Sequence, residues 1–171
     1  MNKRITITYF EPFGLRTTNV SMEVANNLKY NKVMLPVSFD NVEDTIKTLI
    51  YENDILVMLG EAGKYDKIKI ELTPHNIKDG KDNYNIEYHN EEIKDYGPME
   101  LHTNINFDKL DYNYSYNAGK YLCNYSYYLA LYHTTKCRVC FIHLPYVNEL
   151  YTIDYITKEI RKIIDYIINS Y

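Results

Sequence analysis

The sequence predicts an α/β fold in which helices cover both faces of a mostly parallel sheet. Two continuous apolar runs, at 54–59 (DILVML) and 138–144 (RVCFIHL), have the length and composition of strands that are buried on both faces. Segments of helical periodicity separate these strands from others, which is the pattern of βαβ units. A chain of 171 residues with no repeat or linker favours one domain over 1–171.

The amino-terminal half supplies three of the expected strands and two helices. In chain order they are a strand at 4–10, a helix at 20–29, a strand at 32–37, a helix after 40–43 and a strand at 54–59. The turn signal FEPFG at 10–14 ends the first strand. Asn19 or Ser21 can cap the first helix, and Asp40 and Glu43 have the spacing of a capping box for the second.

The carboxyl-terminal half continues the alternation. Its expected elements are a strand at 66–72, a helix from Gly119 to about His133, a strand at 138–144 and a helix beginning near 153. Isoleucines at helical spacing make the last helix strongly amphipathic. Residues 80–115 are polar and rich in Asn, Asp and Gly, so they are expected to be irregular.

Ligand sites in open parallel sheets lie at the carboxyl ends of the strands. This rule places four segments at one edge of the sheet. They are Phe10–Gly14, Gly60–Gly63, Glu71–Asn76 and His143–Tyr146. Any chemistry that the chain performs is expected at that edge.

Composition and charge restrict the partners. A net charge of −4 and a pI of about 5.7, without a basic stretch, disfavour nucleic acid, although 20 tyrosines are available for stacking. No apolar run reaches the roughly 18 residues of a membrane span, and the amino terminus lacks a signal-peptide core. The chain is therefore expected to be cytoplasmic, and its three cysteines to stay reduced.

Cys123 is a candidate nucleophile because of its place in the expected helix. It follows Gly119 by four residues and falls in the first turn, where the helix dipole stabilises a thiolate and lowers the thiol pKa. The alternative is a buried, inert cysteine, which is the commoner fate of an unpaired one. This segment alone leaves both interpretations open.

His143 and Glu71 are candidates for the partners of such a nucleophile. His143 lies where a buried strand meets a loop, which suits a general base, and Glu71 ends its own strand and could orient the imidazole. A hydrogen-bonded core histidine and a solvated carboxylate are the alternatives for the two residues.

A metal site is the competing hypothesis for the cysteines. The series His133, Cys137, Cys140 and His143 has zinc-ligand residue types at roughly suitable spacing. However, the two cysteines sit three apart on an expected strand, and such residues point to opposite faces of a sheet. No metal and no other cofactor is therefore expected.

Short motifs along the chain resemble those of the pyroglutamyl-peptidase family (pyrrolidone-carboxylate peptidases, type I). They are Phe10-Glu11-Pro12-Phe13-Gly14 with Asn19, Leu35-Pro36-Val37, Gly60-Glu61-Ala62-Gly63, Ile70-Glu71 through Asn76, Gly97-Pro98, Asn117-Ala118-Gly119 with Cys123-Asn124-Tyr125, and Phe141-Ile142-His143-Leu144-Pro145. The motifs keep the family's order and span most of the chain.

The resemblance implies a three-layer α/β/α sandwich and a cysteine peptidase that removes amino-terminal pyroglutamate from peptides through a thioester. It implies Cys123 as nucleophile, His143 as base and Glu71 as the residue that orients the base. Substrate contacts are expected from Phe10, Phe13, Asn19 and Glu61. The two phenylalanines would form the wall for a flat lactam ring, although both could instead be core residues. Relatives are often oligomeric, so a homo-oligomer is possible.

Two departures from the family pattern keep other interpretations open. Leu72 follows Glu71 where members usually carry arginine, and Glu61 brings a carboxylate near a pocket for an uncharged ring. The chain could therefore be a thiol amidohydrolase of altered specificity, or a non-catalytic binding protein on the same fold.

Overall fold

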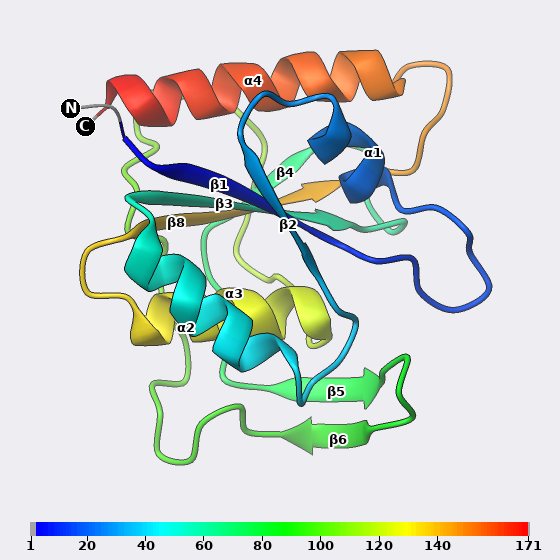
Figure 1. Cartoon of the computed structure of the whole chain (residues 1–171), viewed down its shortest axis with the longest axis vertical. Coiled ribbons are helices and arrows are strands. Elements are labelled where there is room, and N and C mark those ends of the chain that lie inside the picture. The colour runs from blue at the N-terminus through cyan, green and yellow to red at the C-terminus, as the bar shows by residue number, and fades with distance from the viewer. Residues whose placement is uncertain (1–2, 171) are drawn as a thin grey trace.

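The computed structural model describes residues 3–170, which form three layers (Figure 1). A six-stranded sheet with strand order β2-β1-β3-β8-β4-β7 makes the middle layer. The strands are β1 (Ile5–Phe10), β2 (Asn31–Leu35), β3 (Ile55–Glu61), β4 (Lys69–Glu71), β7 (Tyr114–Ser115) and β8 (Arg138–Leu144). Neighbouring strands run parallel except β4 and β8, which are antiparallel. The mostly parallel α/β fold predicted from the sequence is confirmed.

Four helices form the outer layers. They are α1 (Val20–Asn26), α2 (Val42–Glu52), α3 (Leu122–His133) and α4 (Ile153–Asn169). Helices α1 and α4 cover one face of the sheet, and α2 and α3 cover the other (Figure 1). Among the described residues, no helix has the length and apolar character needed to cross a membrane.

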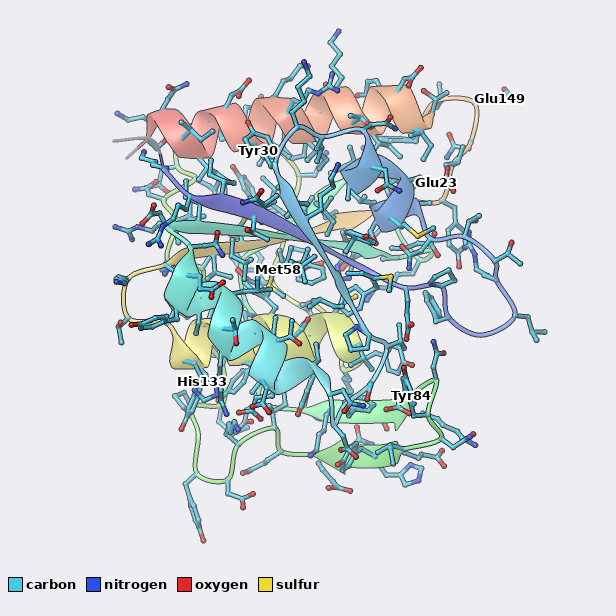
Figure 2. All side chains as sticks on the ribbon, viewed as in Figure 1. Glu23, Tyr30, Met58, Tyr84, His133 and Glu149 are labelled. Carbon is cyan, nitrogen blue, oxygen red and sulfur yellow. The ribbon has the colours of Figure 1, made fainter. Side chains whose placement is uncertain are left out.

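The burial pattern explains why these segments take their places. Every residue of β3 is buried, and β8 is buried beyond Arg138, as expected for central strands with helices on both faces. Side chains of β3 alternate between the two cores. Val57 packs in the α1/α4 core. Met58 packs in the α2/α3 core (Figure 2). Five isoleucines of α4 complete the first core, namely Ile156, Ile160, Ile163, Ile164 and Ile167.

Several local predictions were wrong. The helix α2 has Asn41 as its N-cap, in helical backbone conformation and without a side-chain capping bond, so Asp40 and Glu43 form no capping box. The segment 80–115 is not wholly irregular. It contains β6 (Glu87–Glu91), which forms an antiparallel hairpin with β5 (Lys78–Lys81), and it contains β7. Both hairpin strands are largely polar, with β5 half-buried and β6 mostly exposed, so they lack the apolar alternation that marks a strand in sequence.

The side chain of Asn124 fastens the segment before this hairpin to α3. Its Oδ1 accepts the backbone N–H of His75 at 2.9 Å, and its Nδ2 donates to the carbonyls of His75 and Ile77 at 2.9 and 2.8 Å. Asn124 is fully buried, so these bonds satisfy an amide that would otherwise be costly to bury. The contact fixes the start of α3 relative to β4.

Candidate active site

Cys123 lies at the start of α3, as the sequence predicts. It is the second residue of the helix, after a turn in which Gly119 adopts φ +89° and donates its N–H to Asn117 Oδ1 at 2.9 Å. A positive φ of this size favours glycine, so the turn depends on that residue. The turn aims the first residues of α3 at the edge of the sheet.

The thiol of Cys123 rests on β3 at Gly60. A Cβ atom added to Gly60 would lie 2.8 Å from Cys123 Sγ and 2.7 Å from the Phe141 ring. Only a residue without a side chain leaves room for the sulfur at this position. Gly60 is the register partner of His143 on β8, so the thiol lies above the residue paired with the histidine.

The imidazole of His143 is held by Glu71. His143 Nδ1 lies 2.6 Å from Glu71 Oε1, and the two residues are 3% and 0% exposed. Residues two apart on a strand share a face, and the rings of His143 and Phe141 are 4.9 Å apart. Because Phe141 also borders the space above Gly60, His143 faces the same side of the sheet as the thiol.

The strand direction of β4 corrects one prediction. Glu71 pairs with Phe141 and Lys69 pairs with His143, in antiparallel register. Residues 71–76 therefore run away from the carboxyl ends of the parallel strands, and the expectation that this segment lies at the common edge was wrong. Glu71 reaches His143 diagonally, from two positions along the neighbouring strand.

The electrostatics of the thiol differ from the expectation of a lowered pKa. Burial of the sulfur raises the pKa of Cys123 to about 12, and the negative charge of Glu71 adds to that rise, while Lys64 opposes it. Part of the residue remains open to solvent, but its sulfur is packed between Gly60 and Phe141. Desolvation and the charge of Glu71 therefore outweigh the influences that lower the thiol pKa, and the resting thiol is protonated at neutral pH.

Phe10 and Phe13, the two phenylalanines expected to contact the substrate, lie in different surroundings in the structure. Phe10 is 3% exposed and belongs to the core between the sheet and α2 and α3. Phe13 is partly buried, and its ring centroid lies 6.5 Å from that of Tyr121, the residue that caps α3 two positions before Cys123. Of the two phenylalanines, Phe13 is the one that flanks the start of α3.

Asn19 and Glu61 meet at the amino terminus of α1. Asn19 is its N-cap and accepts the Ser21 N–H at 2.9 Å. Glu61 Oε2 accepts the Val20 N–H at 2.8 Å, and Arg16 Nη1 lies 2.8 Å from the other oxygen. Both side chains are engaged in holding the segment that follows Phe13.

The zinc hypothesis finds no support in the geometry. Cys137 and Cys140 are fully buried in different cores, on opposite faces of the sheet. His133 on α3 bonds to Glu43 at 2.9 Å instead. Among residues 3–170, no group of three or more His, Cys, Asp or Glu side chains is arranged to hold a metal ion.

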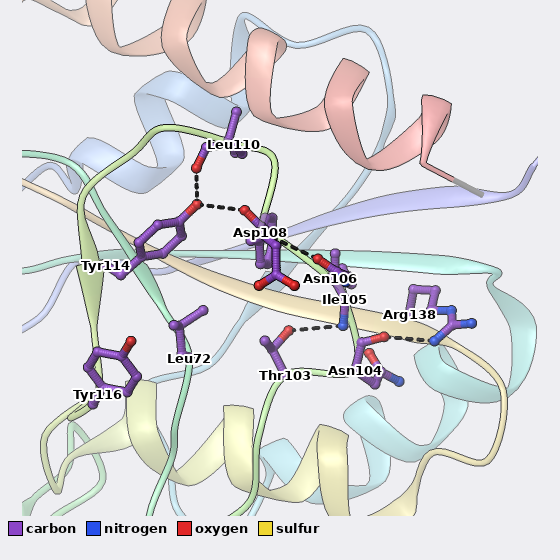
Figure 3. Close-up of a pocket in the computed structure, with 11 residues that line it drawn as sticks. Leu72, Thr103, Asn104, Ile105, Asn106, Asp108, Leu110, Tyr114, Tyr116 and Arg138 are labelled. Atoms are coloured by element: carbon purple, nitrogen blue, oxygen red, sulfur yellow. Dashed lines mark hydrogen bonds between the residues drawn. The ribbon is translucent and has the colours of Figure 1, made fainter.

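A cavity of about 620 Å³ lies elsewhere on the molecule (Figure 3). Leu72, Tyr114 and Arg138 are among the residues that line it. Arg138 begins β8, five residues before His143 and roughly 16 Å from it along the strand, whereas Leu72 directly follows Glu71, so the cavity runs along β8 toward the site. Leu72, which replaces the arginine usual in the family, contributes to this cavity.

Sequence analysis missed Tyr65, in the loop between β3 and β4. Its hydroxyl lies 3.1 Å from Glu71 Oε1, and its ring packs edge-on against His143 at 5.5 Å between centroids. No motif marks this residue, because a contact between a loop and a strand six residues later has no characteristic spacing. The described site thus comprises a thiol, an imidazole, a carboxylate and a phenol.

Comparison with known proteins agrees with this architecture. The family model described as pyroglutamyl peptidase matches residues 3–163. The pyrrolidone-carboxylate peptidase of Bacillus subtilis is 30% identical over 174 residues, which cover 87% of this chain and 81% of that protein. Pyroglutamyl-peptidase 1 of Homo sapiens is 25% identical over 186 residues, covering 95% and 88% of the two chains.

Solved structures give the same result at the level of the fold. The crystal structure of pyrrolidone carboxyl peptidase from Thermus thermophilus superposes with a TM-score of 0.83 at 25% identity, covering 92% of this chain and 96% of the other. The enzyme from Thermococcus litoralis gives 0.87 at 24% identity, with coverages of 98% and 94%. From the family match and the sequence relatives, this chain belongs to the pyroglutamyl peptidase family.

Proposed function

We propose that this protein is a cysteine peptidase that removes an amino-terminal pyroglutamyl residue from peptides. The observation that carries the proposal is the constellation of Cys123, His143 and Glu71. The thiol lies above the register partner of His143, and Glu71 holds the imidazole at 2.6 Å. Membership of the pyroglutamyl peptidase family supplies the substrate class.

The proposed reaction begins with a neutral thiol. Because burial raises the pKa of Cys123, His143 takes the thiol proton as the sulfur attacks the pyroglutamyl carbonyl. The tetrahedral intermediate collapses, the C–N bond breaks, and the imidazolium returns that proton to the leaving amine. Water, activated by the same imidazole, then hydrolyses the thioester and releases pyroglutamate. Glu71 keeps the imidazole in the tautomer that presents Nε2 to the sulfur.

The first turn of α3 is suited to hold the oxyanion. Its N-cap, Tyr121, makes no side-chain capping bond, and its hydroxyl points away from the helix and donates to the Lys81 carbonyl at 2.8 Å. The backbone N–H groups at the start of the helix therefore face the reacting carbonyl without a competing side-chain cap.

The lactam ring would bind beside Phe13 and Tyr121, which supply a flat apolar wall. Phe10, also expected at this wall, supports it from the core. Asn19 and Glu61 were expected to contact the substrate. We propose that they contribute by fastening the segment next to Phe13 to α1.

Turnover of a fluorogenic pyroglutamyl amide tests the proposal. Wild-type protein should release the fluorophore, iodoacetamide should stop the reaction, and EDTA should leave it unchanged. Cys123→Ala should abolish turnover, whereas Cys137→Ala, which removes a fully buried thiol in the core, is the matched control and should retain it.

The same assay separates the alternatives. A thiol amidohydrolase of altered specificity would hydrolyse other amides in an iodoacetamide-sensitive manner but spare the pyroglutamyl one. A non-catalytic relative would hydrolyse none. A homo-oligomer and a cytoplasmic location remain predictions, which gel filtration with light scattering and cell fractionation would test.

A further inference from the structure

We infer that Tyr65 is a positioning residue that fixes the Glu71 carboxylate and, through it, the His143 imidazole. The inference rests on the proposed function and deepens it. Tyr65 lies in the loop between β3 and β4, where its N–H closes a turn onto the Ala62 carbonyl at 3.0 Å. Its side chain reaches back from that turn into the site.

Three polar groups surround the Tyr65 hydroxyl. Glu71 Oε1 lies 3.1 Å away, Ser115 Oγ 3.2 Å away and the Asn117 carbonyl oxygen 3.3 Å away. A phenol has one hydrogen, and a carboxylate is the strongest acceptor of the three. The phenol therefore donates to Glu71, and the Ser115 hydroxyl is placed to donate to the phenol oxygen.

This assignment leaves the two Glu71 oxygens unequal. Oε1 receives both the Tyr65 hydroxyl and His143 Nδ1, whereas Oε2 is buried and accepts no hydrogen bond from residues 3–170. Two donors on one oxygen define the rotation of the carboxylate about its last bond. Without Tyr65, His143 alone would hold that group, and either oxygen could face the imidazole.

Tyr65 also joins Glu71 to the segment that carries the nucleophile. Ser115 is the register partner of Glu71 across β4 and β7. Asn117 follows it, and the Asn117 side chain forms the Gly119 turn that leads into α3. The phenol thus bridges the orienting carboxylate and the backbone that positions Cys123.

The ring of Tyr65 adds a second constraint on His143. It packs edge-on at 5.5 Å with an interplanar angle of 63°. The Nζ atoms of Lys64 and Lys69 lie 5.0 and 5.2 Å from the same ring. Glu71 and Tyr65 contact the imidazole directly, and the charged and titratable groups next to them are Cys123, Lys64 and Lys69.

The hydroxyl has a definable effect on the base. Its hydrogen bond stabilises negative charge on Glu71 Oε1, which weakens the stabilisation that this oxygen offers to the imidazolium. Removing the hydroxyl should therefore make the imidazole more basic and its orientation less defined. The first effect moves the acid limb of the pH–rate profile to higher pH, and the second lowers kcat.

Tyr65→Phe tests the inference, because it deletes the hydroxyl and keeps the ring. We expect kcat for a pyroglutamyl amide to fall about 10-fold, the magnitude of a hydrogen bond to a charged group, with KM changed less than about twofold. The acid limb of kcat/KM should move to higher pH. The matched control is Tyr51→Phe, on α2, where the ring is 78% exposed, and it should change neither quantity.

The same substitution made in Glu71→Gln protein distinguishes a positioning role of Tyr65 from a general loss of packing in the site. In Glu71→Gln protein, Tyr65→Phe should add less than about a twofold loss, because the group through which it acts is already altered. Additive losses, or a Tyr65→Phe enzyme with wild-type kcat and pH profile, would overturn the inference.

An NMR spectrum of the His143 ring keeps the test independent of turnover. If wild-type protein hydrolyses no pyroglutamyl amide, the proposed function fails, but the Nδ1 proton of His143 still reports its hydrogen bond to Glu71. A changed chemical shift of that proton in Tyr65→Phe at constant pH, with none in Tyr51→Phe, supports the positioning role, and an unchanged shift refutes it.

Discussion

The sulfur of Cys123 occupies the space that any side chain at position 60 would need. A Cβ on Gly60 would lie 2.8 Å from Cys123 Sγ and 2.7 to 2.9 Å from the Phe141 ring, closer than real Cβ contacts. The glycine of β3 thus sets how near the nucleophile can come to the sheet. The first glycine of the Gly60-Glu61-Ala62-Gly63 motif therefore helps to determine the position of the Cys123 sulfur.

Gly60→Ala should therefore impair catalysis more than a surface glycine substitution does. Displacing the sulfur or the Phe141 ring should cost about 1–3 kcal/mol of stability and lower kcat at least tenfold. Thermal unfolding and turnover measure the two effects. Gly14→Ala, where nothing lies within 4 Å of the added carbon, is the comparison for loss of a glycine without a steric clash, although its φ of +63° adds backbone strain that Gly60 lacks. Equal kcat losses in both variants would contradict the steric explanation.

The accessibility of the thiols predicts their order of labelling. Limited iodoacetamide at neutral pH should modify Cys123 first, because Cys137 and Cys140 are fully buried. Burial raises the pKa of Cys123 to about 12, so the thiolate fraction grows with pH throughout the usual range. The labelling rate should rise about tenfold per pH unit from pH 6 to 9. Peptide mass mapping reads the site, and a rate plateau near neutral pH would instead indicate a preformed thiolate.

The sequence predicted most of this arrangement for identifiable reasons. β3 and β8 were recognisable because strands buried on both faces are continuous apolar runs, and the place of Cys123 followed from a glycine turn before a helix. The opposite faces of Cys137 and Cys140 followed from strand alternation. These features depend on local periodicity, which a single sequence carries.

The remaining features depend on contacts that periodicity does not encode. The antiparallel direction of β4 is set by its pairing with β8, and the three residues of β4 are too few to reveal it. The hydroxyl of Tyr65 and the guanidinium of Arg16 join loop residues to the last residues of two strands, Glu71 of β4 and Glu61 of β3. The thiol pKa reflects burial and the charge of Glu71, opposed by Lys64, and these influences come from residues far apart in the sequence.

The Arg16–Glu61 ion pair should matter for stability because one partner is buried. The side chain of Glu61 is 1% exposed and that of Arg16 is 36% exposed. Arg16→Gln would leave a buried carboxylate held only by the Val20 N–H. We expect a loss of about 1–2 kcal/mol, below that of a fully buried pair because solvent already screens Arg16. The double variant Arg16→Gln/Glu61→Gln should recover most of it.

The pH dependence of that loss follows from the Glu61 pKa. Burial raises this pKa, with the Val20 N–H and Arg16 acting against the rise. A carboxyl whose folded pKa exceeds its unfolded value favours folding in its protonated form. Stability should therefore fall as pH rises from the unfolded to the folded pKa, and more steeply in Arg16→Gln. Urea unfolding between pH 4 and 8 measures it. Arg4→Gln, which breaks the exposed pair with Asp54, leaves Glu61 and Arg16 in place and should keep the wild-type slope.

Substrate choice depends on the neutral lactam. Pyroglutamyl amides should be hydrolysed, and prolyl and glutamyl amides should not. Proline lacks the lactam carbonyl, so a donor that meets that oxygen would stay buried and unpaired, a penalty of about 1–3 kcal/mol, or roughly 5- to 150-fold in kcat/KM. Glutamate would bring charges that must be desolvated.

Because Glu61 is bound to Val20 and Arg16, Glu61→Gln should alter KM for the pyroglutamyl amide less than about threefold. Preferential hydrolysis of amides with a free amino group would refute the assigned specificity while leaving the thiol mechanism intact.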